Sequence, residues 1–296
     1  MLREKNGRNN RFANILLNRW QQWKKNCIFA SFFLIIMRKI RFILVLFLLS
    51  LPVQQLWAWG KTGHRVIAQV AYDNLNCRAR RQVDKILGKH GIVYYANWAD
   101  EIKSDTIYLN SYDWHYQDFD AGLTDSALIS TLTHYPAEGG SLFRAMDSLV
   151  ALLHREPENV DALRFVIHLM GDRFCPMHLA HLDDRGGTMV RLEWFKQPYN
   201  LHSIWDDGII EVVHYSYSEY AEYVEDVFAN QKKSIQQMSQ EDLLRRNYAL
   251  TNEIYAYQAS WNGNCWNYVY HFARKMEWQL YAAGIRLAML LNEIYG

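Results

Sequence analysis

The stretch His-Leu-Met-Gly-Asp-Arg-Phe-Cys-Pro-Met-His, residues 168–178, combines a helical pattern with a high density of side chains that bind metals. His168 and Asp172 are four residues apart, a spacing that on a helix places both side chains on one face, about one turn apart. Pro176 ends the helical register, so His178 follows a bend and can point toward a neighbouring site. The stretch therefore predicts a helix whose carboxyl end presents imidazole and carboxylate groups.

The same spacing recurs downstream, in Asn-Leu-His-Ser-Ile-Trp-Asp at residues 200–206, where His202 and Asp206 are again four apart. A single pair of this kind arises by chance in a chain with 11 histidines. Two pairs separated by the glycine turn at Gly186-Gly187 are a stronger signal. We expect both pairs to face one shared cleft.

Further histidines and aspartates earlier in the chain extend this pattern. Imidazole nitrogen and carboxylate oxygen are the ligands that zinc takes where thiolates are absent. Burying so many of these groups without cations would cost too much desolvation, so we expect a cluster of metal ions that serves either hydrolysis or metal sequestration. The eight candidate ligands are His64, Asp100, His115, His168, Asp172, His178, His202 and Asp206.

The spacing of apolar residues predicts an all-α fold with at most one short hairpin. Strand-like alternation is scarce, and Met189–Phe195 is its best example. We also expect a long, amphipathic last helix over Tyr268–Tyr295. Apolar residues recur at helical spacing in Val66–Ala71, Leu142–Leu153, Leu163–Met170, Tyr220–Phe228 and Phe272–Ile294.

Residues 1–58 have the character of a leader. From Met37 onward, basic residues precede the apolar run Phe42–Leu51 and a short polar stretch ends at Ala58, which is typical of a secretory signal. This predicts a signal peptide over 37–58 and translation that starts at Met37, with 1–36 a mis-assigned start. The alternative is a membrane anchor built from Ile28–Ile36, although that run is short for a span.

Residues 59–296 are expected to form one domain, without low-complexity linkers or repeats. The chain has 32 basic and 31 acidic residues, of which ten basic residues and one acidic residue lie in 1–58. Residues 59–296 therefore carry 22 basic and 30 acidic residues, a net charge of −8. Such a domain does not attract phosphate by its overall field, so bound cations would have to supply local positive charge. Its three cysteines, Cys77, Cys175 and Cys265, allow one disulfide, but the sequence does not say which.

Together these motifs resemble the zinc-dependent, single-strand-specific nucleases of fungi, plants and some bacteria, which share a fold with bacterial zinc phospholipase C. The resemblance runs from Trp59 to about Ile294. It implies a multi-helix fold of the phospholipase C/nuclease type. The motifs that carry it are Trp-Gly-Lys-Thr-Gly-His at 59–64, Asn-Trp-Ala-Asp-x2-Lys at 97–103, Trp-His-Tyr at 114–116, the segments 168–178, 186–187 and 200–206, and Ala-Gly-Ile-Arg-Leu-Ala at 283–288.

The resemblance implies three zinc ions. The third zinc site requires the mature chain to begin at Trp59, which implies cleavage between Ala58 and Trp59. Asp172 would bridge two of the metals. The implied sets are Asp100, His115, His168 and Asp172 for the first ion, His178, His202 and Asp206 for the second, and His64, Asp172 and the amino nitrogen and carbonyl oxygen of Trp59 for the third.

Family resemblance also assigns roles beyond metal binding. It implies that Asp118 orients the attacking water and that Lys103 neutralises a non-bridging phosphate oxygen. Tyr116 and Tyr199 occupy positions from which an aromatic ring can stack on a base. Base preference stays open, because Gln117 stands where fungal members have an acid. The resemblance gives Cys175 no ligand role, and we interpret it as a small buried hydrophobe.

The function implied is that of a secreted or periplasmic phosphodiesterase that hydrolyses single-stranded RNA and DNA to 5′-nucleotides, with 3′-nucleotidase activity. No stable protein partner and no membrane span in the mature chain are expected. One alternative is a zinc-dependent phospholipase C. In that branch, however, one of the metal ligands that accompany His178 is Glu, whereas this chain has Asp. The other is a non-catalytic metal-binding protein of the cell envelope, which would need neither Asp118 nor Lys103.

Overall fold

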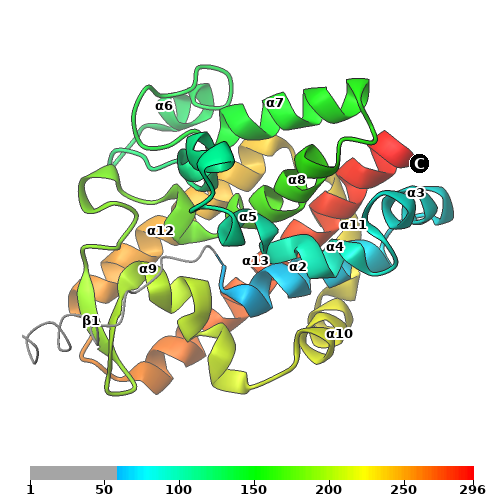
Figure 1. The fold of residues 1–296 in the computed structure, drawn as a ribbon. Helices are drawn as coiled ribbons and strands as arrows, with labels where there is room; N and C mark the ends of the chain where they lie inside the picture. Colours follow the sequence, from blue (N-terminus) through cyan, green and yellow to red (C-terminus); the bar gives the residue numbers. More distant parts are fainter. Residues whose placement is uncertain (1–58) are drawn as a thin grey trace, which may run out of the picture. The chain divides into compact units, whose positions relative to one another are not determined.

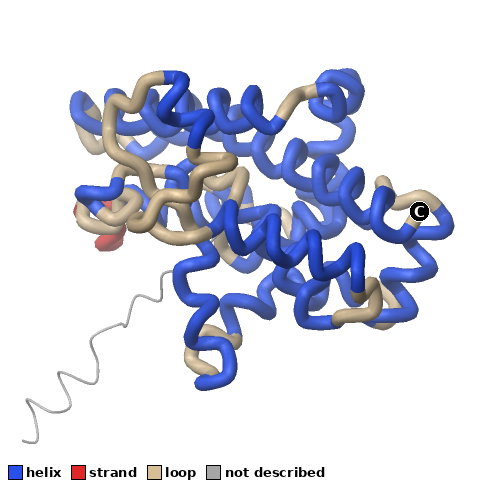
Figure 2. Tube along the Cα trace, turned by 90° about the horizontal axis from the view of Figure 1, so that it is seen from above, coloured by secondary structure: helices blue, strands red, loops and turns tan. Residues whose placement is uncertain are grey.

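Residues 59–296 are the part of the chain that the computed structural model describes, and most of them are helical (Figures 1 and 2). The expected all-α class is confirmed. The predicted leader lies outside the described residues. The α-helices are α2 (Lys61–Asp73), α3 (Cys77–Leu87), α4 (Gly91–Tyr94), α5 (Trp98–Glu101), α6 (Asp125–Ser130), α7 (Leu142–Arg155), α8 (Val160–Asp172), α9 (Leu201–Ser203), α10 (Tyr217–Phe228), α11 (Lys232–Gln237), α12 (Gln240–Ser260) and α13 (Cys265–Tyr295).

Short segments of other helix types connect these elements, and three of them, η2, η3 and η5, carry predicted ligands. The 3-10 helices are η1 (Tyr95–Asn97), η2 (Thr106–His115), η3 (Pro176–Leu179), η4 (Leu182–Asp184), η6 (Ile210–Val213) and η7 (Ala229–Gln231), and η5 (Ile204–Gly208) is a π-helix. η2 ends at His115, and η3 begins at Pro176, which holds the chain in the bend that the proline predicted.

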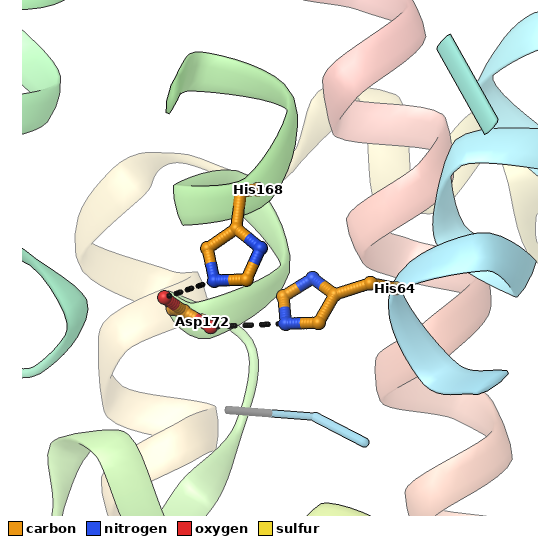
Figure 3. Close-up of side chains that lie close together, drawn as sticks. All are labelled: His64, His168 and Asp172. Carbon is orange, nitrogen blue, oxygen red and sulfur yellow. Dashed lines mark ion pairs between the residues drawn. The ribbon is translucent and has the colours of Figure 1, made fainter. Parts of the chain in front are cut away.

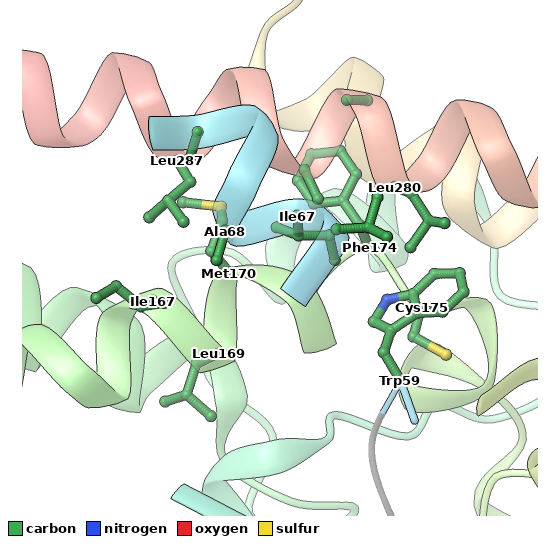
Figure 4. Close-up of a cluster of buried hydrophobic side chains, with 14 of the residues drawn as sticks. Trp59, Ile67, Ala68, Ile167, Leu169, Met170, Phe174, Cys175, Leu280 and Leu287 are labelled. Atoms are coloured by element: carbon green, nitrogen blue, oxygen red, sulfur yellow. The ribbon is translucent and has the colours of Figure 1, made fainter. Parts of the chain in front are cut away.

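Helix α13 forms the packing centre of the described chain. It packs on α2, with which it shares its most extensive contacts, and also on α3, α8, α10 and α11. Gly284 permits the close approach of α13 to α2, because a Cβ at this position would lie 2.5 Å from Val70 Cγ1. α8 packs on both helices of this pair and on α5, η1 and η2, and its apolar residues join Leu280 and Leu287 of α13 in one buried cluster (Figure 4).

Helix α8 begins where its sequence dictates. The side chain of Asn159 caps it by accepting a hydrogen bond from the Ala162 amide at 3.1 Å, and Asp161 lies in the first turn, where a negative charge is favourable. The helix ends at Asp172, before the proline. This end places His168 and Asp172 on the same face, as the spacing predicted.

The predicted hairpin is present and short. β1 (Arg191–Trp194) pairs antiparallel with β2 (Gln197–Asn200). The turn between them consists of Phe195 and Lys196, both at positive φ, which is typical of a two-residue hairpin turn. The strand expected over Met189–Phe195 is therefore shorter at both ends, because the turn begins at Phe195 and pairing starts at Arg191.

The helix expected around the second His-x3-Asp pair has a different form. α9 is only three residues long, capped by the Asn200 side chain, which accepts from the Ser203 amide at 2.7 Å. The chain then widens into η5, where the Ile209 amide donates to the Ile204 carbonyl, five residues earlier. π-helical turns of this kind are rare and often lie at functional sites. The imidazole of His202 and the carboxylate of Asp206 still meet, at 3.2 Å.

The three cysteines of the described chain are all free, so the disulfide that the sequence allowed is not formed among these residues. Cys77 is exposed, Cys265 is partly exposed and Cys175 is fully buried, as expected for a small core residue. None of the helices among residues 59–296 is long and apolar enough to cross a membrane.

Candidate metal centre

Six separate segments deliver the eight predicted ligands to one region. α2 contributes His64, α5 contributes Asp100, η2 contributes His115, and η3 contributes His178. The remaining four come in pairs, from α8 and from the α9–η5 segment. All eight are buried, none more than 8% exposed. Residues separated by more than 140 positions in the sequence thus form one buried polar cluster.

Asp172 lies at the centre of this cluster. Its Oδ1 lies 3.3 Å from His64 Nε2, and its Oδ2 lies 3.3 Å from His168 Nε2, so each carboxylate oxygen faces a different imidazole (Figure 3). The Nδ1 atom of His115 lies 3.0 Å from the same Oδ2. A carboxylate with this arrangement can contribute one oxygen to each of two cations.

A first set of ligand atoms gathers around Asp100. Its Oδ1 lies 3.5 Å from His168 Nε2 and 3.7 Å from His115 Nδ1, and these two nitrogens are 3.1 Å apart. The three residues satisfy the spacing required to hold one metal ion. Together with Asp172 they are the four residues that the family resemblance implies for the first site.

A second set surrounds Asp206. Its two carboxylate oxygens face two imidazoles, with Oδ1 3.5 Å from His178 Nε2 and Oδ2 3.2 Å from His202 Nε2. The thiol of Cys175 also reaches this carboxylate, with Sγ 3.8 Å from Oδ1. The trio that satisfies metal-binding distances here consists of Cys175, His178 and Asp206.

The amino end of the described chain lies beside both sets. The Trp59 indole nitrogen donates to the Gly171 carbonyl at 2.8 Å, and the Gly60 amide donates to the Asp206 carbonyl at 2.5 Å. Trp59 is completely buried. These bonds hold the chain next to His64, Asp172 and the second set, which is the neighbourhood that the predicted third site requires.

Backbone carbonyls fix which nitrogen of three histidines faces the cluster. The Nδ1 atoms of His168, His178 and His202 lie 2.7, 2.6 and 2.7 Å from the carbonyl oxygens of Ala96, His115 and Gly186. Because a carbonyl only accepts, each Nδ1 carries a hydrogen and each Nε2 is the nitrogen that faces the cluster. His115 has the opposite orientation, with Nδ1 directed into the cluster.

The donor set fits cations because several of its buried polar atoms have no hydrogen-bond partner among the described residues. Leaving such atoms unsatisfied costs about 1–3 kcal/mol each, and more for a charged group. Metal ions bound by these residues would satisfy such atoms. The atoms are His64 Nε2, Asp100 Oδ2, Asp172 Oδ1 and His178 Nε2.

Electrostatics keep the acidic ligands ionised. Burial by itself raises the pKa of the Asp172 carboxyl, but the neighbouring His168 and His178 hold that pKa well below its ordinary value. Burial lowers the pKa of His115 to about 4. His178 differs: burial opposes its charged form, yet Asp172 and Asp206 raise its pKa to about 9. A cation would therefore have to displace a proton from His178.

A cavity of about 360 Å³ opens onto the cluster, and His115, His178 and His202 form part of its wall. The predicted catalytic residues line it as well. The Lys103 ammonium lies 2.6 Å from Asp100 Oδ1 and remains partly exposed toward the cavity. Asp118 is 6% exposed, and burial raises its pKa to about 7. A water or a phosphate in this cavity would meet both groups.

The two aromatic residues predicted to stack on a base are placed differently. Tyr116 lines the cavity, whereas Tyr199 is not among the lining residues. Tyr199 lies on β2, where burial and the neighbouring Asp207 raise the pKa of its hydroxyl to about 12. Of the two, only Tyr116 borders the cavity, and Tyr199 lies beside Asp207.

Two further cavity residues were missed in the sequence. Tyr112 and Arg185 both line the cavity, and the Tyr112 ring is 55% exposed. Arg185 adopts a left-handed conformation, at φ 56°, directly before the glycine pair. The Asp-Asp-Arg-Gly-Gly run could have indicated a cation held on a tight turn beside the metal motif, because positive-φ residues cluster in such turns.

Comparison with known proteins identifies the family of the chain. The profile of the S1/P1 nuclease family matches residues 59–296. Endonuclease 2 of Arabidopsis thaliana is 26% identical over 268 residues, which cover 80% of this chain and 91% of its own. Endonuclease 1 of the same plant is 30% identical over 196 residues, covering 57% and 60%, and Nuclease S1 of Aspergillus oryzae is 29% identical over 174 residues, covering 56% and 59%. The chain therefore belongs to the S1/P1 nuclease family.

Proposed function

We propose that this protein is a secreted, three-zinc phosphodiesterase that hydrolyses single-stranded RNA and DNA to 5′-nucleotides and also removes phosphate from 3′-nucleotides. The observation that carries the proposal is the buried cluster of unpartnered imidazole nitrogens and carboxylate oxygens at the wall of a cavity that also holds Asp118 and Lys103. Membership of a nuclease family supports hydrolysis of nucleic acid phosphodiesters. Similar proteins are named endonucleases.

Three cations account for the donor atoms. Asp100, His115, His168 and Asp172 would hold the first, and His178, His202 and Asp206 the second. His64, Asp172 and the free amino end of Trp59 would hold the third. Bound zinc would lower the pKa of a coordinated water and offset the negative charge that develops on the phosphate ester.

The other cavity residues would perform the remaining steps. Asp118 would orient the attacking water and accept its proton, because its carboxylate borders the cavity and its Oδ1 has no partner in the described chain. Lys103 would hold a non-bridging phosphate oxygen with its ammonium group. The exposed face of Tyr116 would stack on a base, which only an unpaired strand can present.

The zinc chemistry can be tested with purified protein that starts at Trp59. We expect hydrolysis of single-stranded DNA and of 3′-AMP, complete loss of both with a chelator, and recovery when zinc is returned. Cleavage of a phosphatidylcholine analogue in place of the nucleic acids would contradict the nuclease proposal in favour of a phospholipase. Zinc binding without turnover of any of the three substrates would contradict an enzymatic role.

The third site makes processing part of the proposed function. A signal peptide over 37–58, cut between Ala58 and Trp59, would deliver the protein to the periplasm or beyond and free the amine that the site needs. Residue Trp59 is already held in place by its indole bond to Gly171, so the free amine would lie beside His64 and Asp172.

Retaining Ala58 in front of Trp59 is expected to remove the third zinc, because an amide nitrogen is no longer a ligand. Elemental analysis should show two zinc ions in place of three, and turnover of single-stranded DNA should fall by about 10²–10³-fold, the cost of losing one stabilising group at a developing negative charge. The matched control carries one extra alanine after Gly296 and should retain three zinc ions and full turnover. Three zinc ions in the protein with Ala58 would contradict this site.

A further inference from the structure

We propose that the thiolate of Cys175 is a ligand of the second metal, together with His178 and Asp206. The inference deepens the proposed function, since it concerns the same metal centre. It departs from the family resemblance, which gives this position no ligand role. It also differs from the expectation that Cys175 is only a small buried hydrophobe.

The distances among the three ligand atoms match one coordination sphere. Cys175 Sγ lies 3.8 Å from Asp206 Oδ1, and His178 Nε2 lies 3.5 Å from the same oxygen. All three atoms lie within 4.8 Å of one another. Around tetrahedral zinc, with bonds of about 2.3 Å to sulfur and about 2.0 Å to nitrogen and oxygen, neighbouring ligand atoms are about 3.3–3.5 Å apart. The two distances to Asp206 Oδ1 are thus within a few tenths of an ångström of this range.

The imidazole of His178 is the independent observation that indicates a cation at this point. Its Nδ1 is committed to the His115 carbonyl at 2.6 Å. Its Nε2 is buried and has no hydrogen-bond partner among residues 59–296, although it faces Asp206. A ring nitrogen that is buried in this way, beside a carboxylate and a thiol, is in a position where a metal ion would satisfy it.

The surroundings of the thiol also fit a thiolate ligand better than a core methyl group. Cys175 packs among Trp59, Phe174 and Leu280 on one side (Figure 4), and its sulfur turns toward Asp206 on the other. A cation bound there would displace the thiol proton, as metal binding to cysteine does.

Coordination by Cys175 leaves room for chemistry at the second site. His178 and His202 line the cavity, whereas Cys175 is not among its lining residues. The sulfur would therefore serve the ion from the protein interior and leave the cavity side to water and substrate. A soft sulfur ligand also biases the site toward zinc, cobalt or cadmium and against magnesium or manganese.

Cobalt substitution of the mature protein tests the proposal, because a cobalt–thiolate bond gives a charge-transfer absorption in the near ultraviolet that nitrogen and oxygen ligands do not. The decisive sample is the double variant Cys77→Ala/Cys265→Ala, in which Cys175 is the one remaining thiol of residues 59–296. We expect the band in wild type and in the double variant, and its loss in Cys175→Ala. Cadmium competition should show at least about tenfold weaker binding at one site of Cys175→Ala.

A double variant that carries its full complement of cobalt but lacks the band would overturn the proposal, and so would a band that survives in Cys175→Ala. The double variant leaves the buried thiol intact, so it decides the matter even if Cys175→Ala does not fold. Spectra are recorded without substrate, which separates this inference from the proposed function. Chelator-sensitive cleavage without the band would support the nuclease and refute the thiolate, and the band without cleavage would do the reverse.

Discussion

Asp172→Asn is expected to lower turnover of single-stranded DNA by about 10⁴-fold and to reduce the zinc content from three ions to one. One carboxylate oxygen of Asp172 lies 3.3 Å from His64 Nε2, and the other lies 3.0 Å from His115 Nδ1 and 3.3 Å from His168 Nε2. An asparagine has one neutral oxygen and an amide that cannot bind a cation. Losing the metal charge of two sites forfeits about 5 kcal/mol or more of transition-state stabilisation, or about 10⁴-fold in rate.

The matched control is Asp161→Asn, on the same helix. Asp161 lies in the first turn of α8, accepts a hydrogen bond from the Tyr108 hydroxyl and pairs with Arg164 at 3.3 Å, away from the metal cluster. Surface changes of this kind cost about 0.5 kcal/mol, so turnover should stay within about threefold and zinc content at three. An Asp172→Asn protein with three zinc ions and near-normal turnover would show that Asp172 is not a bridging ligand.

Much of the fold followed from local patterns in the sequence. The α8 helix, the bend at Pro176 and the glycine turn were predicted because each depends on a few neighbouring residues. Helix α8 begins at a cap, the proline ring cannot continue a helix, and the glycines adopt positive φ. The approach of α13 to α2 was not predictable in detail, because it depends on Gly284 meeting Val70, far away in the chain.

The candidate site was predicted to a different depth. The gathering of the eight ligands was expected from two repeated spacings and from the family resemblance, and the structure brings them together. Orientation was not predictable, because the carbonyls that fix His168 and His202 come from Ala96 and Gly186. The π-helical turn η5 was missed since a four-residue spacing fits both helix types. The displacement of Tyr199 from the cavity depends on its register in β2.

Asp118→Asn is expected to lower turnover by about 10³-fold while leaving three zinc ions in place, the usual contribution of a positioned proton acceptor. The side chain borders the cavity, and its Oδ1 has no partner among the described residues. The amide of Asp118 donates to the Gly139 carbonyl at 2.6 Å, which fixes the backbone independently of the carboxylate. Asparagine therefore changes the chemistry of the group and little of the structure.

The pH dependence gives this prediction a second readout. A proton acceptor works when ionised, so wild-type turnover should rise with pH through the pKa of Asp118. Burial raises that pKa to about 7, and bound cations would hold it lower, so the acidic limb is expected below about pH 7. The asparagine of the variant cannot titrate, so the rise of turnover with pH that is due to this residue should be absent from the pH–rate profile of the residual activity. The matched control is Asp120→Asn, at an exposed position, which should keep the wild-type turnover and the acidic limb of the pH–rate profile. Unchanged turnover in Asp118→Asn with full zinc content would assign the proton to another acceptor.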